Sequence, residues 1–141
     1  MHVGESPRRA WVGAVVLLGV GYALVGIVFA LPTTHLRAWR LAAWAVCAVG
    51  YAAHIAYERF RLRSSPGSAA RHVALAVALG AFGLAVGANV HSLSAGSANQ
   101  HRPLLLLSLV IWPVMTALPA FLVALGVSVI LTRALGNAQG G

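Results

Sequence analysis

One stretch of the chain carries four side chains capable of chemistry at helical spacing. At steps of four, three and four residues come Cys47, Tyr51, His54 and Glu58. A helix would place all four on one face. Ionisable groups inside a membrane are costly and mark candidate functional sites. This intramembrane polar face predicts a proton relay, a substrate contact or a cofactor ligand. Alternatively, His54 is a buried histidine satisfied locally, and Glu58 pairs with Arg61 at the interface.

Four histidines flank two neighbouring apolar blocks symmetrically. His35 and His54 stand 19 residues apart, as do His72 and His91. In an antiparallel hairpin, His54 would lie level with His72, and His35 level with His91. The arrangement resembles that of transmembrane b-type cytochromes, and the resemblance implies these four histidines as ligands of haem b. Because residues 19 apart lie about 100° apart around a helix, paired ligands would not share a face. Haem is therefore the alternative, and the expectation is that no cofactor binds.

Other chemistry has little support in the sequence. His35, His91 and His101 fall at one predicted side of the membrane and suit zinc or copper, but no ligand-spacing motif joins them. The chain has two glutamates and no aspartate, so carboxylate dyads and Ser-His-Asp triads cannot be assembled. A glycine-rich phosphate loop is absent as well. We therefore do not expect an enzyme.

Four apolar blocks must position these residues. The 141 residues are 60% hydrophobic and 9% charged, with a mean hydropathy of +0.83. Since a bilayer core takes about 20 apolar residues to cross, the blocks predict spans at approximately 11–31, 38–58, 73–91 and 103–131. Turn-forming segments separate them at Pro32–Thr34, Ser64–Ser68 and Ser92–Gln100, with Thr34 expected to cap the second helix. Residues 1–141 are thus predicted to form one all-α membrane domain, an up-down-up-down bundle of four transmembrane helices.

The net charge of +8 comes from ten arginines and no lysine. With four spans, seven arginines share the side of both termini: Arg8, Arg9, Arg59, Arg61, Arg63, Arg71 and Arg133. The other side has Arg37, Arg40 and Arg102. The positive-inside rule then places both termini in the cytoplasm of a multi-pass cell-membrane protein, expected in a bacterial inner membrane. The charge sets orientation and favours anionic lipid headgroups at the cytoplasmic face, and it does not indicate nucleic acid.

Small residues and prolines indicate how the helices pack. Glycines at steps of three and four in the third block, Gly80, Gly83 and Gly87, predict a helix-packing stripe. A comparable stripe in the first block consists of Gly19, Ala23 and Gly26. Pro113 and Pro119 predict a bend in the fourth helix, because each removes a helical N–H.

Three functional classes follow from these patterns. The favoured one is a structural or accessory membrane protein that forms a homo-oligomer or joins a larger membrane complex. The first alternative is a channel or transporter-like bundle whose polar path includes His54 and Glu58. The second alternative is a haem-binding electron-transfer protein.

Overall fold

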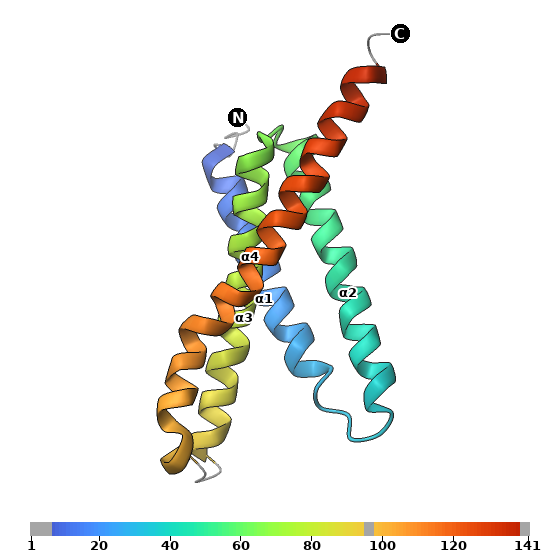
Figure 1. Cartoon of the computed structure of the whole chain (residues 1–141). Helices are drawn as coiled ribbons and strands as arrows, with labels where there is room; N and C mark the ends of the chain where they lie inside the picture. Colours follow the sequence, from blue (N-terminus) through green and yellow to red (C-terminus); the bar gives the residue numbers. More distant parts are fainter. Residues whose placement is uncertain (1–6, 95–97, 139–141) are drawn as a thin grey trace, which may run out of the picture.

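Four α-helices and one π-helical turn make up the computed structural model, which describes residues 7–94 and 98–138 (Figure 1). In chain order they are α1 (Pro7–Val28), α2 (Leu36–Ala56), the π turn η1 (Tyr57–Arg61), α3 (Pro66–Ser94) and α4 (Ala98–Ala138). No strand occurs within those residues. The prediction of an all-helical protein is confirmed.

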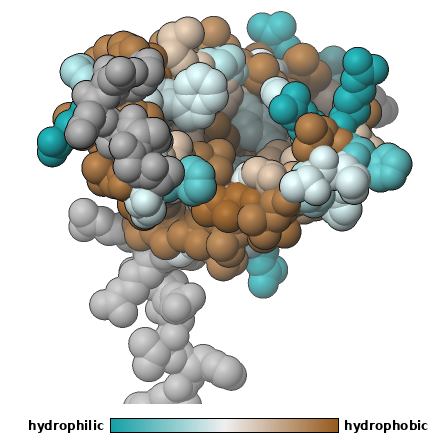
Figure 2. Space-filling model, turned by 90° about the horizontal axis from the view of Figure 1, so that it is seen from below, coloured by the Kyte–Doolittle hydropathy of each residue, from teal (hydrophilic) through white to brown (hydrophobic). Residues whose placement is uncertain are grey.

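Three of these helices are long and apolar enough to cross a membrane. The candidate spans are Ala10–Val28, Pro66–Ser94 and Arg102–Asn137. Large apolar side chains lie exposed on all four α-helices, and Figure 2 shows apolar surface over much of the molecule seen from the lower end of Figure 1. A soluble protein would not expose apolar surface on this scale, so the exterior fits an integral membrane protein.

All four helices begin before the predicted spans, and the starts of α2 and α3 are decided by local signals. His35, not Thr34, occupies the N-cap of α2, in the left-handed region (φ 54°) and without a capping side-chain hydrogen bond. α3 begins at Pro66, seven residues before the predicted span, because proline is well suited to the first helical position. Ser65 caps it, since its Oγ accepts the backbone N–H of Ser68 at 3.3 Å. The turn between α2 and α3 is therefore shorter than predicted.

Glycines bring α1 and α3 into close contact. A Cβ built on Gly80 would stand 2.6 Å from Tyr22 Cβ and 3.1 Å from the carbonyl oxygen of Gly19. A Cβ on Gly83 would stand 2.9 Å from the Cβ of Ala23. The absent side chains are what let the two backbones approach so closely. Gly80 and Gly83 of the predicted stripe thus pack against α1 within one chain, whereas a Cβ on Gly87 would meet no heavy atom within 4 Å.

Helix α4 is long and continuous. Its 41 residues extend about 60 Å at 1.5 Å per residue, and they run unbroken through Pro103, Pro113 and Pro119. Its first half lies beside α3, and its second half crosses toward the end of α2 (Figure 1). Asn89, near the C-terminal end of α3, joins it to the first half of α4, because the Asn89 Nδ2 donates to the carbonyl oxygen of Leu105 at 2.9 Å. A bend at the two central prolines stays a prediction.

Helix α2 joins the other helices mainly at its C-terminal end. There Ile55 packs with Ala70 and Val73 of α3 and with Ala124 of α4 in a small buried core. Toward its N-terminus, α2 runs apart from α3 and α4 (Figure 1). The contacts that hold α2 are therefore concentrated near η1, where the polar residues of the next section lie.

We expect Gly80→Ala to lower the free energy of unfolding by about 1–3 kcal/mol, because the new methyl group overlaps main-chain-attached atoms of α1. Reversible unfolding in mixed micelles measures the change. Gly87→Ala is the matched control, since a Cβ there meets no heavy atom within 4 Å. Equal stability of the two variants would contradict the close approach at Gly80.

Candidate functional site

Glu58 is fully buried, and it is the one carboxylate among the described residues. Its Oε2 accepts a hydrogen bond from Ser64 Oγ at 2.7 Å. Its Oε1 lies 3.0 Å from Nδ1 of His72 and 3.8 Å from Nε2 of His54. A buried carboxylate needs such donors to offset the loss of hydration. Side chains from three separate segments thus converge on this carboxylate, and those of Ser64 and His72 hydrogen-bond to it.

The π turn η1 gives Glu58 this position. The N–H of Leu62 donates to the carbonyl oxygen of Tyr57, five residues earlier, at 3.1 Å. Such a wide turn adds one residue to the helix and rotates the residues after it by about 100°. Arg61 is consequently exposed on the outside. The alternative in which Glu58 pairs with Arg61 is wrong, because the ion pairs of Glu58 in the described chain are with the two histidines.

The chain then reverses so that Ser64 faces Glu58. Arg63 adopts a left-handed conformation (φ 51°), which a residue with a side chain rarely takes. Beyond it, the Ser64 N–H donates to the carbonyl oxygen of Glu58 at 2.9 Å, in addition to the bond from its hydroxyl. Main chain and side chain of Ser64 therefore both fix the glutamate.

Arg59 connects this turn to α4. Its Nη1 donates to the carbonyl oxygen of Ser64, and its Nη2 donates to Thr132 Oγ1 at 2.6 Å. Thr132 in turn donates to the carbonyl oxygen of Ser128 at 2.8 Å. One guanidinium thus ties together η1, the turn that follows it and the second half of α4.

Helix α1 covers the site with an aromatic ring. Trp11 stacks on His72 with ring centroids 4.4 Å apart and planes 3° apart. The His72 side chain keeps 17% of its surface exposed, whereas those of His54 and Glu58 keep none. We call His54, Glu58, Arg59, Ser64 and His72 the Glu58 cluster. All four α-helices contribute to it or contact it.

The cluster can hold and exchange protons. Its imidazoles and carboxylate form a row from the partly exposed His72, through Glu58, to the fully buried His54. Neither ring nitrogen of His54 has a hydrogen-bond partner in the described part of the chain. A proton can therefore pass directly between His72 and Glu58, whereas the 3.8 Å between Glu58 and His54 is too long for a hydrogen bond. Conduction across the whole bundle stays a prediction.

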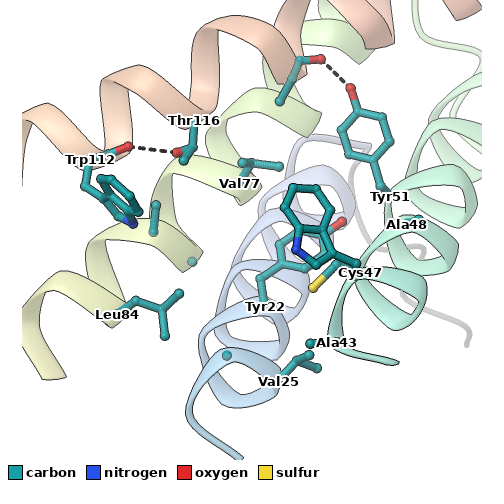
Figure 3. A pocket seen from close by; sticks show the side chains of 15 residues that line it. Tyr22, Val25, Ala43, Cys47, Ala48, Tyr51, Val77, Leu84, Trp112 and Thr116 are labelled. Atoms are coloured by element: carbon teal, nitrogen blue, oxygen red, sulfur yellow. Dashed lines mark hydrogen bonds between the residues drawn. The ribbon is translucent and has the colours of Figure 1, made fainter. Parts of the chain in front are cut away.

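The other half of the predicted polar face has different surroundings. Cys47 and Tyr51 line an apolar cavity to which all four α-helices contribute, and His54 and Glu58 do not line it (Figure 3). The Tyr51 hydroxyl donates to the carbonyl oxygen of Ala120 on α4. The four residues predicted to share one face therefore divide between a polar cluster and a cavity.

The other histidines predicted as haem or metal ligands do not form a cluster in the part of the chain that the structure describes. His35 and His91 are exposed, on helices whose ends diverge in Figure 1. The side chain of His101, like those of Arg8 and Arg9, lies outside the described residues. No three metal-binding side chains within the described ranges are grouped to hold an ion. His54 and His72 do lie near each other, but they share the Glu58 carboxylate. Haem binding stays a prediction.

Sequence reasoning missed most of what surrounds Glu58. The hairpin register did place His54 level with His72, but that pairing was interpreted as haem ligation. No sequence signal indicated the π turn, the reach of Arg59 to α4 or the stacking of Trp11 on His72.

No protein-family model matches the chain, and comparison with curated proteins and with solved structures finds no significant match. Its function is therefore inferred from the geometry of this chain.

We expect Glu58→Ala to lower the free energy of unfolding by about 1–3 kcal/mol, because it leaves the partly buried donors of Ser64 and His72 without their acceptor. Unfolding in mixed micelles measures the loss, and Trp11 emission reports the disturbed stack. Arg61→Gln is the control, with an expected change below about 0.5 kcal/mol, since Arg61 is exposed. An equal loss in both variants would show that Arg61 supports the carboxylate after all.

Proposed function

We propose that the chain crosses the cell membrane four times in an up-down-up-down bundle. Helix α2 has 21 residues, about 31 Å at 1.5 Å per residue, enough for the hydrocarbon core. Its two arginines, Arg37 and Arg40, lie near its first turn, where long side chains reach the interface. The arginine asymmetry supports cytoplasmic termini, with exposed Arg61, Arg63 and Arg133 available to anionic headgroups.

We further propose that the protein is an accessory membrane subunit that self-associates through α2. The supporting observation is a seam of small residues along the outer face of this helix. At alternating steps of four and three come Ala38, Ala42, Ala45, Val49, Ala52 and Ala56. Four of the six are exposed, and the other two are half-buried. This is heptad spacing with side chains small enough for close backbone contact between membrane helices.

The seam lies opposite the face of α2 that the chain itself uses. Cys47 and Tyr51 point into the cavity, and Ile55 packs in the core. The glycine stripes of α1 and α3, by contrast, already pack against each other within one chain. A second copy would therefore meet α2 rather than the glycine stripes. Neither catalysis nor a resident cofactor is part of this proposal.

Self-association can be tested by cysteine crosslinking in membranes, starting from Cys47→Ser to remove the native thiol. Two copies with the same orientation in the membrane pack with their α2 helices parallel. A twofold axis along the membrane normal then brings each seam residue near the same residue of the second copy. We expect Ala52→Cys to form a covalent dimer on mild oxidation. Leu118→Cys is the control, because Leu118 is exposed on α4, away from the seam.

A complementary variant combines Ala45→Leu and Ala52→Leu. The larger side chains would keep the two α2 backbones from approaching closely. We expect it to reduce the dimer fraction at least tenfold in native mass spectrometry. A monomer in the unsubstituted protein, or equal crosslinking at positions 52 and 118, would contradict association through α2.

A further inference from the structure

Three exposed arginines lie at the end of the bundle that holds the Glu58 cluster. Arg61 belongs to η1, Arg63 to the turn that follows it, and Arg133 to the second half of α4. None of the three has a hydrogen bond or an ion pair within the described residues. Glu58, the one carboxylate among those residues, is fully buried and faces two histidines. The described chain therefore leaves these three positive charges without a counter-charge.

A hydrogen bond between η1 and α4 brings two of these arginines to neighbouring elements. Arg59 of η1 donates to Thr132 of α4 at 2.6 Å, so the two elements touch there. Arg61 follows Arg59 by two residues, and Arg133 directly follows Thr132. The two exposed guanidinium groups thus start from backbones that lie side by side.

The third arginine is held by the turn that satisfies Glu58. Arg63 has a left-handed conformation (φ 51°), and its side chain is exposed. The next residue, Ser64, donates its N–H to the main-chain oxygen of Glu58 at 2.9 Å and its hydroxyl to the carboxylate at 2.7 Å. These two hydrogen bonds fix the turn from which Arg63 projects.

The three described arginines at the opposite end are not brought together in this way. Arg37 and Arg40 lie near the start of α2, and Arg102 lies near the start of α4. All three are exposed, but the starts of these two helices lie apart (Figure 1). Equal numbers of arginines are therefore carried by touching elements at one end and by diverging helices at the other.

Apolar surface adjoins the three partnerless arginines. Phe60, which precedes Arg61 on η1, is 59% exposed, and Ile130, three residues before Arg133 on α4, is 66% exposed. A phospholipid combines a phosphate for the guanidinium groups with acyl chains for the apolar side chains. A soluble anion would leave the apolar surface uncovered. The combination of charge and apolar surface thus favours a lipid.

We propose that this end of the molecule binds an anionic phospholipid, with its phosphate held by Arg61, Arg63 and Arg133 and its acyl chains against Phe60 and Ile130. Guanidinium groups suit this role because they bind phosphate oxygens through paired N–H donors. The inference rests on the proposed membrane crossing. It deepens the headgroup contact by assigning it to one group of side chains instead of to the total charge.

Lipid retention by the purified protein tests the proposal. The protein is placed in nanodiscs of phosphatidylglycerol and phosphatidylcholine in equal amounts, and native mass spectrometry counts the lipids that stay bound to each chain. We expect the unsubstituted chain to retain phosphatidylglycerol in preference to phosphatidylcholine. Both leaflets of a nanodisc contain the same lipids, so the result does not depend on which end is cytoplasmic. Failure here is therefore distinguishable from failure of the proposed orientation or of association through α2.

Two triple variants remove the same charge from opposite ends. Arg61→Gln, Arg63→Gln and Arg133→Gln together should lower the retention of phosphatidylglycerol about tenfold, because each exposed arginine near the headgroups adds to the attraction. The matched control combines Arg37→Gln, Arg40→Gln and Arg102→Gln. It should change retention by less than about twofold, since salt screens charges at the opposite end of the molecule.

Three outcomes would overturn the proposal. Equal losses in the two triple variants would show that the lipid responds to total charge alone. Equal retention of the two lipids by the unsubstituted chain would show that no anionic headgroup is selected. Displacement of phosphatidylglycerol by an equal concentration of inorganic phosphate would show that a soluble anion is the occupant.

Discussion

A buried carboxylate imposes the strictest physical demand on this molecule. Glu58 gives up its hydration entirely, and only donors fixed in place can offset that cost. Ser64 and His72 supply hydrogen bonds, while Nε2 of His54 lies 3.8 Å from the carboxylate one turn away. These residues belong to α2, to the turn that follows it and to α3. The need to hydrogen-bond the Glu58 carboxylate therefore fixes how these three segments pack together.

The position of α2 follows from this arrangement. Polar contacts and a small core hold it near η1, while its N-terminal half runs apart from α3 and α4. One face of the helix therefore borders an apolar cavity, and the opposite face presents a seam of small side chains. The proposal of self-association depends on the second of these faces. It requires the small side chains of the seam to stay exposed within one chain.

The sequence predicted the helices better than it predicted their contacts. Apolar block length predicted an all-helical chain, and three of the four blocks coincide with helices long and apolar enough to cross a membrane. His54 and Glu58, which the spacing placed on one face, are both buried. The observed helix ends differ from the predicted ones where a local signal sets the start of the helix, as proline does at Pro66. The π turn was not predictable, because it depends on Glu58 finding donors in a segment that follows it. Arg61 is an example. Regular helical spacing predicted that it pairs with Glu58, but after the π turn its side chain is exposed on the outside.

The glycines show a second limit of sequence reasoning. Their spacing identified a packing surface, but it could not say whether the partner was another helix of the same chain or a second copy. In the structure Gly80 meets Tyr22 and Gly19, so the stripe is satisfied internally. The alanine seam of α2 was overlooked because alanine is common throughout the chain, and only its exposure distinguishes it.

A double-mutant cycle on Glu58→Gln and His72→Gln most directly tests the role of the carboxylate as the anchor of α2. The free energy of unfolding is measured for the unsubstituted chain, each single variant and the double variant. Since the two side chains are in contact at 3.0 Å, a coupling energy of about 1–3 kcal/mol is predicted. Additive effects, within about 0.5 kcal/mol, would mean that the two groups act independently and would contradict the account.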